Sequence, residues 1–91
     1  MEQIAKQVVF KGRVQGVGFR YTAHRIGRQY ELSGYVKNCP DGSVEALLQG
    51  TQANIQACID EIQDAFNGYI RETKSTDQPV NPRYHDFRIT Y

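Results

Sequence analysis

Two spacings of apolar residues alternate along the chain and predict its secondary structure. In several stretches every second residue is apolar, which is typical of a strand with one buried face. In others the apolar residues recur every third or fourth position, as on the buried side of a helix. The predicted order is a strand at 7–14, a helix at 19–30, strands at 32–38 and 43–49, a helix at 52–66, a more polar edge strand at 69–76 and a last strand at 84–91.

Turn and cap residues support these boundaries. Pro40-Asp41-Gly42 is a strong turn signal, so the strands on either side of it form a hairpin. Thr51 is a suitable N-cap for the second helix, and the stretch 77–83, which contains two prolines, predicts a loop. Gly27 lies inside the first helix at a cost of about 1 kcal/mol relative to alanine. We attribute its presence to close packing of this helix against the sheet.

This order of elements predicts an α+β fold of the ferredoxin-like class. Strand, helix, strand, strand, helix and strand, followed by a short fifth strand, form a βαββαβ sandwich when each crossover is right-handed. We expect one antiparallel sheet of four to five strands with both helices on one face. The chain has 91 residues, which suits a single domain spanning 1–91.

The segment 12–20, which reads Gly-Arg-Val-Gln-Gly-Val-Gly-Phe-Arg, joins the first strand to the first helix. Gly16 and Gly18 permit backbone angles that let successive N–H groups point at one anion. The following helix adds free N–H groups and the positive end of its dipole, and Arg20 adds a planar cation that suits phosphate oxygens. This stretch fits a phosphate site, and it also fits a tight turn whose glycines merely avoid clashes. It is not a Walker loop, because no Gly-Lys-Ser/Thr follows the glycines.

Asn38 is the second candidate, because it ends the second predicted strand. Its amide can both donate and accept hydrogen bonds, so it can hold a water molecule. The same amide can also cap the turn that follows. Sequence spacing does not give the distance between Asn38 and Arg20, so both interpretations stay open on the residues alone.

Composition and charge remove several other classes of function. The chain carries 11 basic and 10 acidic residues, a formal net charge of +1, which gives no electrostatic footprint for nucleic acid or an anionic membrane. The first residues lack the apolar region of a signal peptide. No apolar run approaches the ~20 residues that span a bilayer. These features predict a soluble, cytoplasmic protein.

The remaining reactive side chains suggest no further chemistry. Cys39 and Cys58 are expected to be free thiols, with Cys58 on the apolar stripe of the second helix. His24 and His85 do not form a zinc-binding spacing with them. We expect His24 on the surface of the first helix. No serine stands in the setting of a hydrolase nucleophile.

Three motifs together resemble the acylphosphatase family. They are G-R-V-Q-G-V-G-F-R at 12–20, S-G-Y-V-K-N at 33–38 and P-D-G-S-V-E at 40–45. The resemblance covers nearly the whole chain, including the closing F-R-I-T-Y at 87–91. It implies an enzyme that hydrolyses the carboxyl–phosphate bond of small acyl phosphates to a carboxylate and inorganic phosphate. It further implies that no metal or organic cofactor is needed, and that inorganic phosphate is a product and a competitive inhibitor. We expect a monomer that binds neither nucleic acid nor membrane.

The resemblance also implies a role for each residue that matches a motif. Arg20 would bind and neutralise the phosphoryl group, and Asn38 would orient the attacking water, which favours the functional interpretation of Asn38. No residue would act as a covalent nucleophile, and the phosphate of the substrate would itself assist as the base. Backbone N–H groups of six residues would hold the phosphoryl oxygens: Gln15, Gly16, Val17, Gly18, Phe19 and Arg20.

Two alternatives belong to other classes. The first is an RNA-binding module of the same fold, because the stretch 16–21 superficially resembles the glycine-aromatic strand of an RNA-recognition motif. That motif belongs on a central strand with exposed aromatic residues, whereas these glycines precede a helix. The second is a domain that binds phosphate or an acyl phosphate and does not turn it over.

Overall fold

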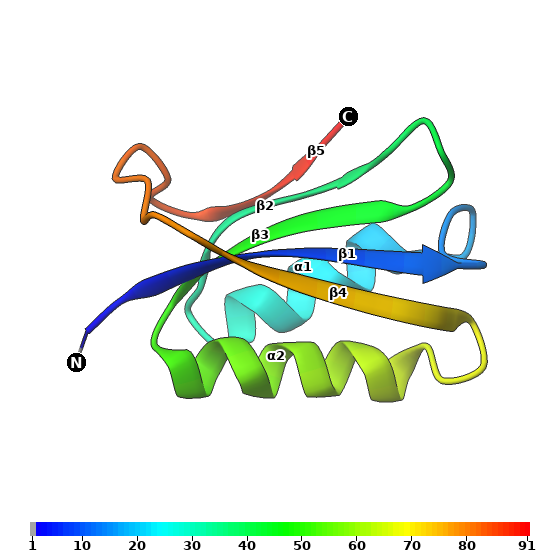
Figure 1. The fold of residues 1–91 in the computed structure, drawn as a ribbon, viewed down its shortest axis with the longest axis horizontal. Helices are drawn as coiled ribbons and strands as arrows, with labels where there is room; N and C mark the ends of the chain where they lie inside the picture. The colour runs from blue at the N-terminus through cyan, green and yellow to red at the C-terminus, as the bar shows by residue number, and fades with distance from the viewer. Residues whose placement is uncertain (1) are drawn as a thin grey trace.

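The helices and strands follow the predicted order. The computed structural model describes residues 2–91, so Met1, the first residue of the predicted domain, lies outside the described residues. The elements are β1 (Ile4–Gly12), α1 (Phe19–Gln29), β2 (Ser33–Asn38), β3 (Val44–Gly50), α2 (Gln52–Ala65), β4 (Ile70–Gln78) and β5 (Phe87–Thr90). Both helices cover the same face of the sheet, as predicted (Figure 1). No helix within residues 2–91 is long and apolar enough to cross a membrane.

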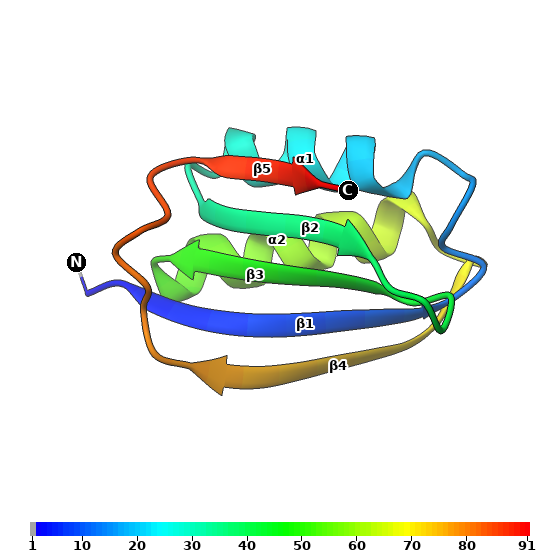
Figure 2. The same cartoon turned by 90° about the horizontal axis from the view of Figure 1, so that it is seen from above.

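The sheet has five strands in the order β4-β1-β3-β2-β5 (Figure 2). The pairs β4–β1, β1–β3 and β3–β2 are antiparallel, but β5 lies parallel to β2. The prediction of a wholly antiparallel sheet is therefore wrong for this edge, although the ferredoxin-like class is confirmed. The direction of β5 follows from the connection between β4 and β5, which lie at opposite edges of the sheet. The chain passes over one end of the sheet to the opposite edge, so β5 runs back in the same direction as β2.

The boundaries of β1, β4 and β5 differ from the prediction by two residues or more, and those of β2 and β3 by one. β1 ends at Gly12, although the apolar alternation continues to Val14, because the next loop buries the Val14 side chain against the core. β4 extends to Gln78 because its backbone pairs with β1 along the whole stretch, and Asp77 there forms an ion pair with Lys6 at 3.2 Å. β5 covers only 87–90, because the stretch 84–86 still belongs to the preceding loop.

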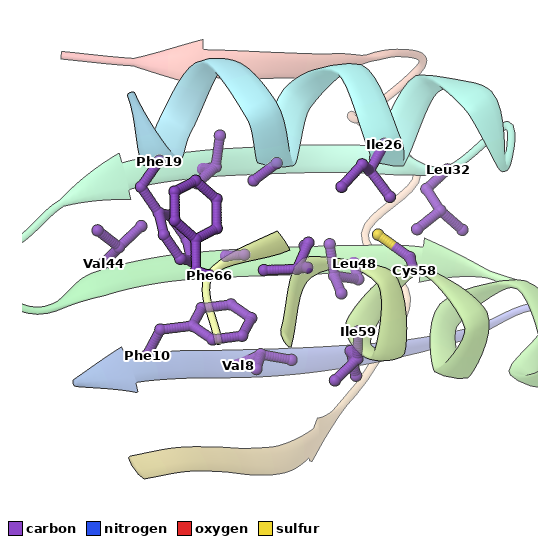
Figure 3. Close-up of a cluster of buried hydrophobic side chains, with 14 of the residues drawn as sticks. Val8, Phe10, Phe19, Ile26, Leu32, Val44, Leu48, Cys58, Ile59 and Phe66 are labelled. Carbon is purple, nitrogen blue, oxygen red and sulfur yellow. The ribbon is translucent and has the colours of Figure 1, made fainter. Parts of the chain in front are cut away.

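The core lies between the helices and the sheet (Figure 3). The ring of Phe19, the first residue of α1, lies 5.1 Å from the ring of Phe10 and 4.5 Å from that of Phe66, measured between centroids. Cys58 is buried on α2, as predicted, and its burial raises the pKa of the thiol to about 12. This thiol therefore stays protonated and acts as a core side chain. Phe19 at the same time anchors the start of α1, where the candidate site begins.

α1 is also fixed against β5. A Cβ atom on Gly27 would lie 2.4 Å from the ring of Phe87, so the predicted close packing of Gly27 is confirmed. His24, which was expected on the helix surface, is half-buried. Its Nε2 atom is 2.8 Å from the carbonyl oxygen of Phe87, and its ring stacks on the Phe87 ring. α1 thus has a defined position over the edge of the sheet, which sets the position of its first turn.

Candidate active site

The loop between β1 and α1 carries two glycines in the left-handed conformation. Gly16 has φ 76° and Gly18 has φ 77°, values that favour glycine over any residue with a side chain. The loop is fixed at its start by Arg13, whose N–H donates to the carbonyl of Tyr69 at 2.9 Å. α1 begins with a bond from Thr22 N to Gly18 O, and Gly18 provides no side-chain cap. The first turn of the helix is therefore open to a ligand.

The backbone N–H groups of the stretch 15–20 differ from that of Arg13, which is bonded to Tyr69. Within residues 2–91, the structure records no protein acceptor for the N–H groups of the stretch 15–20. Free donors at the start of a helix carry the positive charge at that end of its dipole and form a ready site for an anion. The tight-turn interpretation explains the glycine conformations, but it leaves this row of free donors without a function.

A small hollow of about 120 Å³ lies beside this loop. Of the predicted phosphate-binding residues, four line it, and Asn38 faces them from the end of β2. Gln15 and Val17 do not line the hollow, whereas Val14 and Tyr21 do and were missed. Tyr21 has 75% of its surface exposed, but this is known only from the structure, and no signal for it is present in the sequence. The lining residues are Val14, Gly16, Gly18, Phe19, Arg20, Tyr21 and Asn38.

Asn38 reaches the hollow because of its place on β2. It lies two residues after Val36, whose side chain is buried on the helix-facing side, so Asn38 faces the same side beyond the core. Its side chain is exposed, and no hydrogen bond is recorded for its amide within the described residues. The role of turn cap belongs instead to Asp41, whose Oδ1 accepts bonds from Ser43 N at 3.0 Å and Ser43 Oγ at 2.6 Å. These two bonds lower the pKa of Asp41. The turn-cap interpretation of Asn38 is thus not supported.

Arg20 stands in the first turn of α1 and is held from the side of β5. Its Nη1 atom donates to the carbonyl of Thr90 at 3.3 Å, and its guanidinium carbon lies 4.8 Å above the ring of Tyr91. An arginine has five N–H donors, so the bond to Thr90 leaves others available at the hollow. A backbone carbonyl and an aromatic ring therefore contact the cation without neutralising its charge.

Three further observations concern Gln15, the cysteines and the possible metal ligands. The side chain of Gln15 donates hydrogen bonds to the carbonyls of Cys39 and Ser43, in the turn that follows Asn38. Cys39 and Cys58 are both free cysteines, as predicted. Within residues 2–91, no three His, Cys, Asp or Glu side chains gather in a way that could hold a metal ion.

Comparison with known proteins places the chain in a family. Its sequence matches the acylphosphatase family over residues 6–89. The chain belongs to the acylphosphatase family. It is 40% identical over 83 residues to an acylphosphatase of Picrophilus torridus, covering 91% of this chain and 98% of that one. It is 34% identical over 92 residues to an acylphosphatase of Lacticaseibacillus paracasei, covering 99% of each.

A solved acylphosphatase shares the whole fold. The crystal structure of acylphosphatase from Bacillus subtilis superposes with a TM-score of 0.89 at 31% identity, covering 97% of this chain and 99% of that one. The resemblance drawn from the motifs is thus confirmed. The RNA-binding alternative is not supported, because the glycine-aromatic segment lies in a loop and a helix rather than on a central strand.

Proposed function

We propose that the hollow is the active site of this acylphosphatase and that it binds the phosphoryl group of the substrate. The protein hydrolyses acyl phosphates, as its family does. The single observation that carries the assignment of the site is that one hollow is lined by Asn38 and by four residues of the stretch 15–20, Arg20 among them. Within residues 2–91, no protein acceptor is recorded for the N–H groups of that stretch. A tetrahedral phosphoryl group needs several donors from different directions, and this arrangement supplies them.

Arg20 and the loop act on the charge of the phosphoryl group. Phosphoryl transfer passes through a loose transition state with negative charge on the equatorial oxygens, so catalysis depends on oriented donors and electrostatics. The backbone N–H groups are fixed by the loop, and Arg20 is fixed by Thr90 and Tyr91. Because these groups are arranged before the substrate arrives, little reorganisation is needed during the reaction.

Asn38 orients the water that attacks phosphorus. A new P–O bond forms to the water oxygen while the bond between phosphorus and the acyl oxygen breaks, and its electron pair leaves with the carboxylate. The water proton passes to a phosphate oxygen of the substrate, so the protein needs no general base and no covalent nucleophile. The unpartnered amide of Asn38 is suited to this role because it can both donate to and accept from a water molecule.

The reaction is proposed to proceed without a metal or an organic cofactor. Arg20 supplies the positive charge at the phosphoryl group, and a carboxylate is already a good leaving group. The test is a spectrophotometric assay of benzoyl phosphate hydrolysis with and without EDTA. We expect equal rates and competitive inhibition by inorganic phosphate. Loss of activity in EDTA would contradict the metal-free proposal, and phosphate binding without turnover would support the silent-domain alternative.

The role of Asn38 is tested by Asn38→Ala. We expect kcat to fall about 100- to 1000-fold, the usual effect of removing one oriented group in a site of this kind, while the affinity for inorganic phosphate changes little. Asn67→Ala is the matched control, because Asn67 is exposed at the end of α2, outside the hollow. A wild-type kcat for Asn38→Ala would refute the positioning of water by Asn38.

A monomeric state, a cytoplasmic location and a single domain over 1–91 remain predictions. Light scattering across a range of protein concentrations tests the first. A constant mass equal to that of one chain would support a monomer, and a mass that rises with concentration would contradict it.

A further inference from the structure

We infer that the side-chain amide of Gln15 is a positioning residue, which sets the distance between the phosphate-binding loop and Asn38. Its Nε2 atom donates to Cys39 O at 2.8 Å and to Ser43 O at 2.9 Å, so both hydrogens of the amide nitrogen are used. The two acceptors lie 24 and 28 residues further along the chain. The inference rests on the proposed function, because it gives Gln15 its effect through Asn38.

The bonds are placed where they join the two halves of the site. Gln15 directly precedes Gly16, and Cys39 directly follows Asn38, and both Gly16 and Asn38 line the hollow. Gln15 itself does not line it. The side chain of Gln15 thus binds the backbone of Cys39. This contact lies just outside the hollow and joins the two segments that line it.

The loop depends on this contact more than an ordinary surface loop would. Backbone bonds fix it at Arg13 and at Gly18, and within the described residues none is recorded for the N–H groups between them. Free N–H groups are needed to bind a phosphoryl group, so the loop cannot be stabilised through its own backbone donors. The side chain of Gln15 stabilises it without using them.

The partner of Gln15 is itself rigid. In the turn after β2, Cys39 N donates to Ser43 O at 2.8 Å and Gly42 N donates to Cys39 O at 3.1 Å. Each of the two carbonyls therefore accepts one bond from within the turn and one from Gln15, which uses both lone pairs of each oxygen. An anchor made this way holds Asn38 at a fixed separation from the loop. That precision matters, because a displacement of about 1 Å between reacting groups can cost about 100-fold in rate.

The first test is a double-mutant cycle with benzoyl phosphate as substrate. Gln15→Met keeps the length of the side chain and removes both donors, and we expect kcat to fall about 10- to 100-fold. If Gln15 acts through Asn38, the double variant Gln15→Met/Asn38→Ala should be no slower than Asn38→Ala alone. Gln29→Met, an exposed position near the end of α1, is the matched control and should retain wild-type kcat.

The outcomes separate this inference from the proposed function. A fully multiplicative loss in the double variant, or a wild-type kcat for Gln15→Met, would overturn the role of Gln15 while Asn38→Ala still shows its own loss. A wild-type kcat for Asn38→Ala would overturn the proposed role of Asn38, and this inference with it.

A second variant serves if Gln15→Met does not fold. Gln15→Glu has the same shape but cannot donate while its carboxylate is ionised, which holds above about pH 4.3 for an ordinary glutamate. A protonated carboxyl regains one O–H donor. The kcat of Gln15→Glu relative to the wild type should therefore rise as the pH is lowered, whereas a ratio that stays constant with pH would contradict the donor role.

Discussion

The two ends of the sheet are each held by a glutamine amide, but the two glutamines have different surroundings. At the end where β1 and β2 finish, Gln15 is exposed and joins the loop before α1 to the turn that follows Asn38. At the opposite end, Gln49 is only 2% exposed and holds the loop 79–86 over the sheet (Figure 2). Its Oε1 accepts from Asn81 N at 2.6 Å, and its Nε2 donates to Asn81 O and to Ser33 Oγ, each at 3.1 Å.

The difference in burial separates stability from activity. A buried polar group that loses its partners cannot bond to water instead, so disrupting the network of Gln49 should destabilise the fold. Donors and acceptors at the exposed end can exchange their partners for water at low cost. Their geometry matters for the reaction rather than for folding. Variants at one end should therefore change turnover, and variants at the other should change the free energy of unfolding.

The largest effect is expected at the site end, from Arg20→Gln. The substitution removes the cation at the hollow, and we expect kcat/KM to fall at least about 1000-fold. This is the upper end of the loss usually seen when one oriented group is removed. The melting temperature should change little, because the side chain lies at the surface of α1. Benzoyl phosphate kinetics and thermal unfolding measure the two quantities.

Arg25→Gln is the control for Arg20→Gln. Arg25 is exposed on the same helix, and among the described residues no ion pair or hydrogen bond is recorded for its side chain. A similar loss of turnover in both variants would show that the charge of α1, rather than a specific contact with the phosphoryl group, is responsible.

The next effect is expected at the opposite end, from Gln49→Met. The substitution leaves Asn81 N, Asn81 O and Ser33 Oγ without this partner, and we expect a loss of about 1–3 kcal/mol in the free energy of unfolding. Urea denaturation measures the loss, and kcat should remain that of the wild type.

Gln56→Met provides the comparison for Gln49→Met, because the one hydrogen bond recorded for the Gln56 side chain within residues 2–91 goes to Asp60 at the surface of α2. We expect it to change the free energy of unfolding by less than about 0.5 kcal/mol. A reduced kcat in Gln49→Met together with an unchanged free energy of unfolding would contradict the proposal that this end of the sheet affects stability and the other end affects turnover.

The smallest effect concerns pH at the site end. Ser43 lowers the pKa of Asp41 through two hydrogen bonds, so the contribution of Asp41 to stability is present above its unfolded pKa and is lost as the pH falls through its folded pKa. Ser43→Ala removes the hydroxyl donor, and the pKa of Asp41 should rise toward its usual value of about 3.9. An NMR titration of the Asp41 carboxyl measures the change. An unaltered titration would show that the backbone N–H of Ser43 alone sets this pKa.

Much of the fold could be predicted from local patterns, because its strands and helices carry clear apolar periods. The sequence also indicated the two segments of the site, although the residues alone left a tight turn and a turn cap as alternatives. The resemblance of the motifs to the acylphosphatase family favoured the functional interpretation of Asn38. The prediction failed where a distant partner decides the outcome. The apolar alternation continues to Val14, but Val14 belongs to a loop and packs on the core. The polar stretch of β4 forms a long strand because β1 pairs with it.

The contacts that complete the site could not be predicted in the same way. Gln15 and Gln49 look like any other glutamine in the sequence, and each finds its acceptors at least 16 residues away. The direction of β5 depends on which edge of the sheet the chain reaches after β4. Such features depend on the assembled sheet and leave no local pattern.

The bond between Arg20 and Thr90 closes a stretch of 70 residues and has a kinetic consequence. Pairing between distant segments is slow because a long loop must be ordered first. During refolding, β1, β3 and the helices can collapse together before β5 reaches its edge, and until then the guanidinium lacks its carbonyl and its ring. Recovery of secondary structure should consequently precede recovery of catalysis, and the lag between them would time the arrival of the last strand.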